Sequence, residues 1–141
     1  MNIPKKILVL CTGNSCRSQI AEGYLRHFAG EKALVYSAGI ESHEVNPKVV
    51  EIMAADGIDV SHQTSNNILE YENIEFDFII TVCDHALENC PVLKSNALRF
   101  HSNFPDPTKT IGPESLVQKE FEAVQLMIKK YCSDFIEDNI I

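Results

Sequence analysis

The fold is decided by a stretch near the N-terminus, residues 6–25, which reads KILVLCTGNSCRSQIAEGYL. Residues 7–10 form a continuous apolar run, which is typical of a strand buried on both faces of a parallel sheet. A polar loop follows at 11–18. Apolar residues then recur at helical spacing from Ile20 until Gly30, a residue type that commonly follows the last turn of a helix. The stretch therefore predicts a strand, a loop and a helix in succession.

The same alternation continues towards the C-terminus. Short hydrophobic runs predict three further strands, at residues 33–37, 76–82 and 97–101. Asn46, followed by Pro47, predicts the N-cap of a helix that ends at Gly57. Ser65 predicts the cap of a shorter helix, and apolar residues that step by four and three from Val117 predict a long final one. This order predicts an α/β fold, a three-layer domain with a four-stranded parallel sheet flanked by helices, in which ligands bind beyond the carboxyl ends of the strands.

Length and composition limit the class of protein. The 141 residues suffice for a single domain, which we expect to span residues 1–141. Hydrophobic residues make up 45% and charged residues 23%, which excludes disorder and coiled coil. No apolar run approaches the roughly 18 residues of a membrane span and no cleavable signal precedes the first strand, so we expect a cytoplasmic protein without a membrane partner. The net charge of −8 argues against a nucleic-acid partner, but residues 1–35 carry five basic and only two acidic residues, which favours an anion site there.

The loop 11–18 has the features of an oxyanion site with its own nucleophile. It joins a buried strand to a helix N-terminus, where free backbone N–H groups and the helix dipole attract anions. Cys11 opens the loop, and Arg17 follows closely enough for its guanidinium to grip two oxygens of a tetrahedral oxyanion while the thiolate faces the central atom. We expect a lowered pKa for Cys11 and left-handed backbone at Gly13 and Asn14. The predicted oxyanion-binding residues are Thr12, Gly13, Asn14, Ser15, Cys16, Arg17 and Ser18.

This loop resembles the phosphate-binding loop of the low-molecular-weight protein tyrosine phosphatase fold. More closely, the chain resembles the thioredoxin-coupled arsenate reductases, in the loop 11–19 and in the motifs Ala21-Glu22-Gly23, Tyr36-Ser37-Ala38-Gly39-Ile40-Glu41, Val45-Asn46-Pro47, Thr64-Ser65 and Asn89-Cys90-Pro91. The resemblance covers nearly the whole chain and weakens over the last thirty residues. It implies an enzyme that reduces arsenate to arsenite, with weak phosphatase activity.

Asp106 is the candidate general acid. It lies between Pro105 and Pro107, which stiffen the backbone on both sides. Asp-Pro is also a common turn dipeptide. The resemblance places a catalytic aspartate in this loop before a proline, and it therefore implies that Asp106 protonates the oxygen that leaves when Cys11 attacks.

Two further cysteines suit a redox reaction. Reduction of As(V) to As(III) takes two electrons, which a pair of thiols supplies by becoming a disulfide. The resemblance implies that Cys11 attacks arsenate, that Cys83 then attacks Cys11 and releases arsenite, and that Cys90 attacks Cys83. Thioredoxin would reduce the resulting Cys83–Cys90 disulfide as the external reductant. We expect Cys90 to reach Cys83 by local unwinding of segment 84–95.

Other interpretations of these cysteines are open. The six residues between Cys83 and Cys90 do not fit zinc-ligand spacing. Inert burial competes with the redox role for Cys83. We expect Cys16 to be structural and Cys132, beside the apolar stripe of the last helix, to be a core residue.

Two alternative functions follow from the same residues. The first is a tyrosine-phosphate phosphatase that uses Cys11, Arg17 and Asp106 alone. Absence of tryptophan and the polar segments after Gly39 and Pro107 disfavour the deep aromatic cleft that such an enzyme needs. The second is a non-catalytic module that binds an oxyanion or thioredoxin, which the presence of nucleophile, arginine and acid together disfavours.

The resemblance also raises the question of a cation. In some relatives the positions of Asn14, Glu22 and Ser37 hold a monovalent cation such as K⁺ under the loop. The fourth position of that set is Asn66 here, where those relatives have an aspartate. The change removes one negative charge from the set, and Asn14 and Glu22 can equally be ordinary loop and first-turn residues. We expect no tightly bound cofactor.

Overall fold

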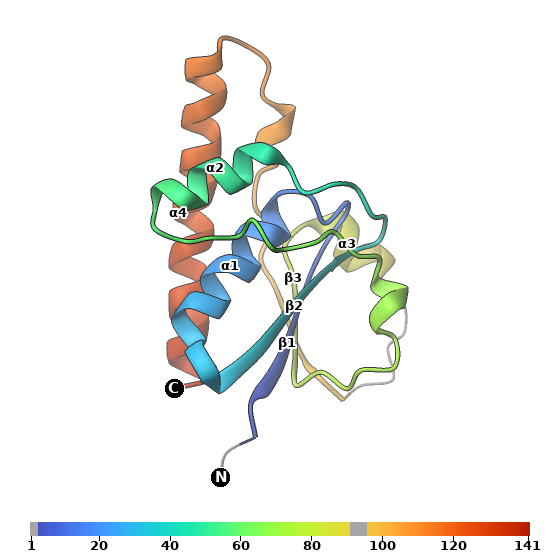
Figure 1. The fold of residues 1–141 in the computed structure, drawn as a ribbon. Helices are drawn as coiled ribbons and strands as arrows, with labels where there is room; N and C mark the ends of the chain where they lie inside the picture. Colours follow the sequence, from blue (N-terminus) through green and yellow to red (C-terminus); the bar gives the residue numbers. More distant parts are fainter. Residues whose placement is uncertain (1–2, 91–95) are drawn as a thin grey trace.

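The computed structural model describes residues 3–90 and 96–141. Within these residues the strands form one all-parallel sheet of order β2-β1-β3-β4, as predicted. The strands are β1 (Lys5–Cys11), β2 (Ala33–Gly39), β3 (Phe78–Thr81) and β4 (Leu98–His101). Because β1 lies between β2 and β3, residues that follow β1 and β3 are neighbours at one edge of the sheet (Figure 1).

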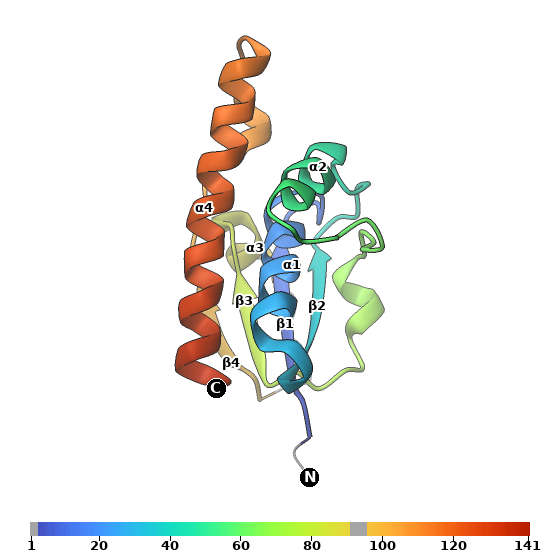
Figure 2. The same cartoon turned by 60° about the vertical axis from the view of Figure 1, so that its left-hand side comes forward.

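Helices cover both faces of this sheet. They are α1 (Arg17–Ala29), α2 (Pro47–Ala55), α3 (Asp84–Asn89) and α4 (Glu114–Asn139), with short 3-10 turns η1 (Gly30–Lys32), η2 (Ile68–Tyr71) and η3 (Pro107–Lys109). Figures 1 and 2 show α1 and α4 side by side on one face, α3 and η2 on the other, and α2 crossing the upper end of α1. The result is the predicted three-layer arrangement.

The two faces are packed by different aromatic groups. On the α4 face, Phe135 packs edge-on against Phe78 and Phe100, with ring centroids 5.4 and 5.1 Å apart. On the opposite face, Tyr36 of β2 packs edge-on against Tyr71 of η2. Successive residues of a strand point to opposite faces, so a sheet with two such covers must be apolar on both. This explains why the central strand β1 has a continuous apolar sequence.

The helix boundaries confirm most of the local predictions. The Asn46 side chain accepts a hydrogen bond of 2.9 Å from the Lys48 backbone N–H, and Pro47 is the first residue of α2. Gly57 lies just beyond the helix with a φ of 79°, which favours glycine. The backbone thus ends α2 where the sequence predicts.

The predicted cap at Ser65 is wrong. Asn67 caps the following turn instead, because its side chain accepts from the Leu69 N–H while the Glu70 carboxylate accepts from the Asn67 N–H. This reciprocal pair satisfies two free donors at once, which a single serine cannot do. Ser65 instead donates to the Gly13 carbonyl.

The segment after β3 also differs from the prediction. The strand ends at Thr81, and Cys83 is the N-cap of α3 rather than the last residue of the strand. Residues 84–89, for which no helix was predicted, form a short helix that includes the buried Ala86. Cys83 therefore lies at the carboxyl edge of the sheet at one end of a helix, and Cys90 at the other.

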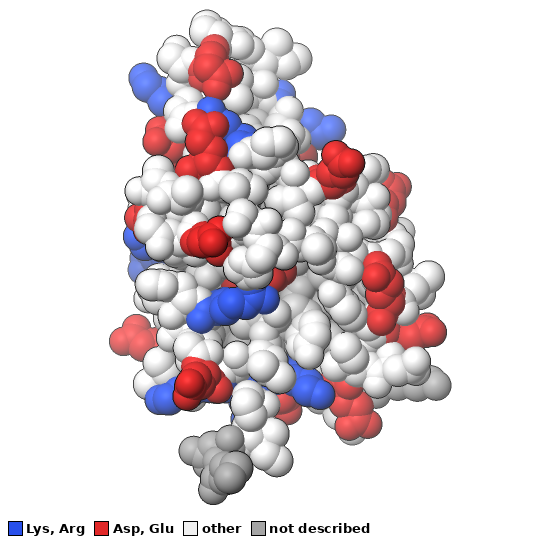
Figure 3. All heavy atoms as spheres, in the orientation of Figure 1, with Lys and Arg blue, Asp and Glu red and all other residues white. Residues whose placement is uncertain are grey.

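On the face seen in Figure 3, the acidic side chains are not gathered in one patch. In Figure 3 acidic side chains are spread over the visible face, with basic ones among them. None of the helices in residues 3–90 and 96–141 is long and apolar enough to cross a membrane.

Candidate active site

The loop between β1 and α1 is held open by the segment that follows β2. Backbone N–H groups of segment 40–46 donate at 2.8–3.2 Å to four loop carbonyls, those of Cys11, Thr12, Gly13 and Ser15. The Asn14 carbonyl accepts from Gln19 Nε2 at 2.9 Å. All these carbonyls are thus turned to protein donors on the outside of the loop.

The backbone N–H groups of residues 13–17 are in the opposite situation. In the part of the chain that the structure describes, no protein acceptor takes them. They belong to a loop that enters a helix N-terminus, an arrangement that binds anions. The loop can therefore surround an oxyanion with N–H donors.

Asn14 and Gly13 shape this loop in different ways. Asn14 has a φ of 51°, the left-handed conformation that was predicted. Its side chain donates to the hydroxyls of Ser18 and Ser37 and accepts from the Asn66 N–H, so its conformation is fixed by three buried bonds. The prediction for Gly13 is wrong, because its φ is not positive. Glycine is needed there because a Cβ would collide with the His43 ring.

Arg17 and Asp106 face Cys11 across one cavity. Arg17 Nη1 donates to the Phe104 carbonyl at 2.9 Å, and Arg17 Nη2 lies 3.7 Å from Asp106 Oδ2. Asp106 Oδ1 accepts from the N–H and the hydroxyl of Thr108. A cavity of about 310 Å³ lies between these groups, and its lining includes Cys11, Gly13, Arg17, His43, Asp106 and Lys109. The three residues predicted for oxyanion chemistry thus share a single cavity.

The Cys11 and Cys83 side chains lie on neighbouring segments at the carboxyl edge of the sheet although they are 72 residues apart. Both are almost fully buried, and Thr12 Oγ1 lies 3.3 Å from Cys83 Sγ. Hydrogen bonds from Cys11 and Thr12 and the charge of Arg17 lower the pKa of Cys83 to about 5. The same bond between the two sulfurs, together with burial, raises the pKa of Cys11 in spite of Arg17 and the Thr12 N–H.

The prediction of a lowered pKa for Cys11 is therefore wrong, and the thiol with the lowered pKa is that of Cys83. Two hydrogen-bonded thiols share one proton, so the pair loses its first proton easily and holds its second. This makes Cys83 the more acidic sulfur and leaves the Cys11 thiol as its hydrogen-bond donor.

Cys90 lies at the opposite end of α3 from Cys83. The two cysteines flank the six residues of this helix, and the seven steps between them at 1.5 Å each separate their Cα atoms by about 10 Å. A disulfide needs Cα atoms roughly 4.4–6.8 Å apart, so α3 must unwind before the two can be joined. The predicted unwinding segment 84–95 includes α3, while its residues 91–95 lie outside the described part of the chain.

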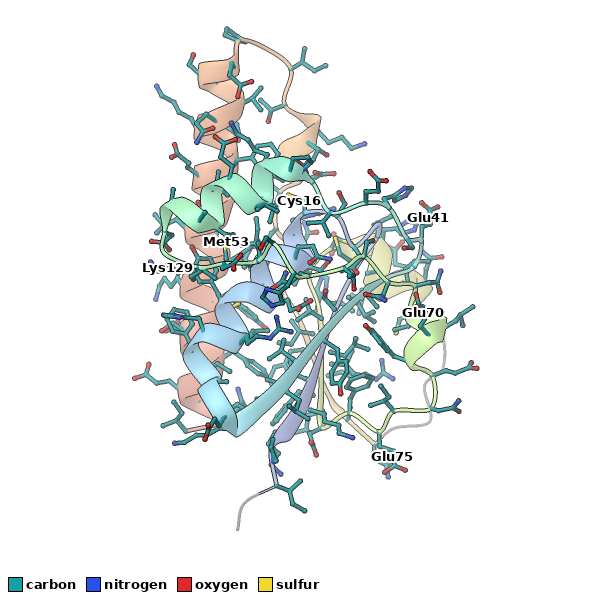
Figure 4. All side chains as sticks on the ribbon, viewed as in Figure 1. Cys16, Glu41, Met53, Glu70, Glu75 and Lys129 are labelled. Carbon is teal, nitrogen blue, oxygen red and sulfur yellow. The ribbon has the colours of Figure 1, made fainter. Side chains whose placement is uncertain are left out.

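The other two cysteines occupy structural positions. Cys16 is buried at the N-terminal end of α1, and burial raises its pKa to about 12. Figure 4 shows Cys16 where the loop enters α1, and Glu41 on the segment beyond β2. Cys132 is fully buried in α4, where its thiol donates to the Ala21 carbonyl and burial raises its pKa. Neither thiol is poised for nucleophilic attack.

The predicted cation ligands meet, but they satisfy one another. Ser37 Oγ donates to Glu22 Oε1 at 2.5 Å, and Arg26 Nη2 donates to Glu22 Oε2 at 2.6 Å. The Asn66 side chain points elsewhere, accepting from the Thr64 hydroxyl and donating to Glu70. The Glu22 charge is thus neutralised by an arginine, and this set of residues does not fit K⁺.

Several features of the site escaped the sequence analysis. The Arg26–Glu22 pair has the i, i+4 spacing of a helical ion pair and could have been found. The hydrogen bonds from segment 40–46 to the loop carbonyls, and the position of His43 beside the loop, could not be predicted from local sequence. Both depend on how β2 packs beside β1.

Comparison with known proteins places these features in context. The model of the family "Low molecular weight phosphotyrosine protein phosphatase" matches residues 6–139. An arsenate reductase of Halalkalibacterium halodurans is 44% identical, covering 94% of this chain and 96% of its own. An arsenate reductase of Bacillus subtilis is 41% identical over the same shares. A solved structure of an arsenate reductase in its oxidized state superposes with a TM-score of 0.80 at 30% identity, covering 95% of this chain and 98% of its own.

Proposed function

The chain belongs to the low-molecular-weight phosphotyrosine protein phosphatase family, and from this membership we propose that it reduces arsenate to arsenite with its own thiols. The observation that carries the proposal is a second buried thiol, Cys83, beside the oxyanion loop, with its Sγ 3.3 Å from Thr12 Oγ1. A phosphatase of this kind needs only one cysteine, because water hydrolyses its intermediate. A second thiol near the first is what a two-electron reduction requires.

The first step is attack of Cys11 on arsenate. Arg17 and the loop N–H groups hold three arsenate oxygens, and the Cys11 sulfur forms a bond to arsenic as its proton passes to the Cys83 thiolate. Asp106 lies beside Arg17 at the cavity and protonates the departing oxygen, which leaves as water.

The second step transfers the electrons. Cys83, the more acidic sulfur, gives up this proton to an arsenic-bound oxygen and attacks the Cys11 sulfur as a thiolate. An S–S bond forms while the S–As bond breaks, and the electron pair of that bond stays on arsenic. Arsenic thereby becomes As(III) and leaves as arsenite.

The third step moves the disulfide away from the loop. The Cys90 thiolate attacks Cys83, an S–S bond forms between them, and Cys11 leaves as a thiolate ready for the next cycle. Thioredoxin, as an external dithiol in the reducing cytoplasm, then reduces the Cys83–Cys90 disulfide.

A phosphatase activity is the second candidate. The group of Cys11, Arg17 and Asp106 around one cavity suffices to hydrolyse a small phosphate ester. We expect it as a weak side reaction.

The test is a coupled assay of arsenate-dependent NADPH consumption with thioredoxin and its reductase, run beside hydrolysis of a small phosphate ester. Cys83→Ser and Cys90→Ser should each stop multiple-turnover arsenate reduction and leave ester hydrolysis intact. Cys132→Ala is the matched control and should keep both activities. Wild-type arsenate turnover by both relay variants would show that the electrons come from elsewhere.

A further inference from the structure

Two side chains of β4 face α3. Strand residues two positions apart share a face of the sheet, so Arg99 and His101 point to the same side. Phe100 between them points to the other side, where it packs against Phe135 of α4. The α3 helix thus lies along a strand that presents two cationic or polar groups to it.

His101 holds the end of α3 that carries Cys83. Its Nε2 lies 2.7 Å from Asp84 Oδ1, and its Nδ1 lies 2.7 Å from Thr81 Oγ1. Asn103 Oδ1 accepts from the Asp84 N–H. Two side chains, those of His101 and Asn103, therefore anchor the first residue of α3, and Thr81 holds the His101 ring.

Arg99 contacts the other end of α3. Its Nη1 donates to Cys90 Sγ at 3.6 Å, and Cys90 is half-buried at the C-cap. The contact brings a fixed positive charge to the sulfur that must act last in the proposed relay. An arginine side chain is long and flexible, whereas the shorter His101 side chain is held by two hydrogen bonds.

We propose that Arg99 is a further catalytic residue, which stabilises the negative charge of the Cys90 sulfur and stays with it while the last turn of α3 unwinds. The inference rests on the proposed function and deepens its third step. In that step the Cys90 thiolate forms an S–S bond to Cys83, and the Cys11–Cys83 bond breaks with its electron pair on Cys11.

The geometry of β4 makes this movement feasible. The Cα atoms of Arg99 and His101 are two strand residues apart, about 6.6 Å. His101 and Arg99, two positions apart on β4, therefore contact opposite ends of α3. As the last turn of α3 unwinds, the flexible Arg99 side chain can follow Cys90 while His101 holds the Asp84 end in place.

The experiment is a single turnover with arsenate and the reduced protein in the absence of thioredoxin. Acid quenching, thiol blocking and peptide mapping follow the Cys11–Cys83 and Cys83–Cys90 disulfides, and released arsenite is measured separately. Arg99→Gln should slow Cys83–Cys90 formation about fivefold, as expected for an exposed charge contact, and leave the rate of arsenite release unchanged. The Cys11–Cys83 disulfide should accumulate in that variant.

Charge variants separate this role from a structural one. The rate of Cys83–Cys90 formation should fall in the order Arg99, Arg99→Lys, Arg99→Gln, Arg99→Glu, and 1 M salt should bring the rates together. Lys119→Gln, which removes the same charge from the exposed side of α4, is the matched control and should react like wild type. Equal rates for all Arg99 variants at low salt would overturn the inference.

A second measurement does not depend on arsenate. Alkylation of Cys90 by iodoacetamide in the reduced protein should be about fivefold slower in Arg99→Gln than in wild type at one pH. If wild type forms no disulfide with arsenate while this difference is present, the proposed function fails and the contact stands. If Cys90 reacts equally in both proteins, the role of Arg99 is refuted whatever the substrate.

Discussion

At the scale of single residues, two sulfurs determine what the oxyanion loop can do. Cys11 lies where Arg17 and the loop N–H groups converge, and it shares a proton with Cys83. One proton and one negative charge belong to this pair. In the proposed relay the loop supplies the nucleophile Cys11, and Cys83, at the start of α3, is the thiolate that displaces it.

Cys11→Ser should abolish arsenate reduction and ester hydrolysis together, because both begin with a bond to this sulfur. We expect a loss of at least about a hundredfold in each kcat/KM, which corresponds to roughly 2.7 kcal/mol of transition-state stabilisation. Steady-state assays of both reactions on one preparation measure it. Retention of either activity would assign its nucleophile to another residue.

The shared proton predicts a thiolate at low pH. Absorbance at 240 nm should report one thiolate appearing as the pH rises through about 5, the pKa of Cys83. Cys11→Ala removes the hydrogen bond that lowers this pKa most, so the step should move to higher pH. A titration that is unchanged by Cys11→Ala would contradict the contact between the two sulfurs.

The same pKa has a consequence for stability. Since the pKa of Cys83 is lowered from its ordinary 9.0, the unfolded chain binds more protons there between pH 5 and 9. The thiolate therefore adds stability as the pH rises through this window, and the gain is lost as the pH falls through about 5. The raised pKa of Cys11 acts only above pH 9. Urea unfolding of wild type and Cys83→Ala should show a difference that grows from pH 5 to pH 8.

At the scale of elements, segment 40–46 and α3 act on the loop from two sides. Segment 40–46 orients the loop carbonyls outward, while Cys83 and Cys90 flank α3. The contact between segment 40–46 and the loop must stay rigid for anion binding. The helix α3 must unwind for the proposed disulfide to form.

Gly39→Ala should displace segment 40–46 from the loop. A Cβ at Gly39 would collide with the Glu41 carbonyl and press on the Thr12 carbonyl and the Asn14 N–H, which are backbone atoms that cannot turn away. We expect sulfate or arsenate binding to weaken at least about tenfold, as for the loss of one well-aligned donor. Calorimetric titration measures it.

Gly57→Ala is the matched control for this variant. A Cβ there meets nothing within 4 Å, but the φ of 79° makes alanine strained by about 1 kcal/mol. It should lower stability and leave anion affinity unchanged. Equal anion affinities in the two variants would show that the hydrogen bonds from segment 40–46 do not shape the loop.

Oxidation should loosen α3. After one turnover with arsenate, peptide mapping should find Cys83 linked to Cys90 and Cys11 free for alkylation. Amides of α3 should exchange faster than in the thiol form, since the helix must unwind to close the bond. A dominant Cys11–Cys16 link would show that the loop oxidises within itself.

At the scale of the whole molecule, α4 supports the site from the far side of α1. Its buried face packs along α1, whose first residue is Arg17. Tyr131 of α4 also packs edge-on against Phe104, so α4 supports the site through α1 and through the segment before Asp106.

Two neighbouring residues of α4 separate these effects. Ile128 is 0% exposed, and Ile128→Ala should lower the free energy of unfolding by about 2–5 kcal/mol. Met127 is 49% exposed, and Met127→Ala should cost less than about 1 kcal/mol. Urea unfolding measures both. Neither variant should change the anion affinity of the folded protein, and a change in either would mean that α4 acts on the loop directly.

What the sequence determined by itself is the local part of this protein. The apolar run of β1, the loop between Cys11 and Arg17, and the Asn46 cap of α2 follow from residues that are close in the chain, where spacing and turn preferences decide the geometry. The family resemblance added roles for Asp106, Cys83 and Cys90.

Only the tertiary structure decided which distant groups meet. Arg17 meets Asp106 across 89 residues, and Cys11 meets Cys83 because β3 lies beside β1. Proton sharing between those sulfurs moved the lowered pKa to Cys83, since a pKa depends on neighbours in space and not in sequence. The helix α3 and the contact of Arg99 with Cys90 likewise arise because β4 packs beside β3, and no local pattern encodes that order of strands.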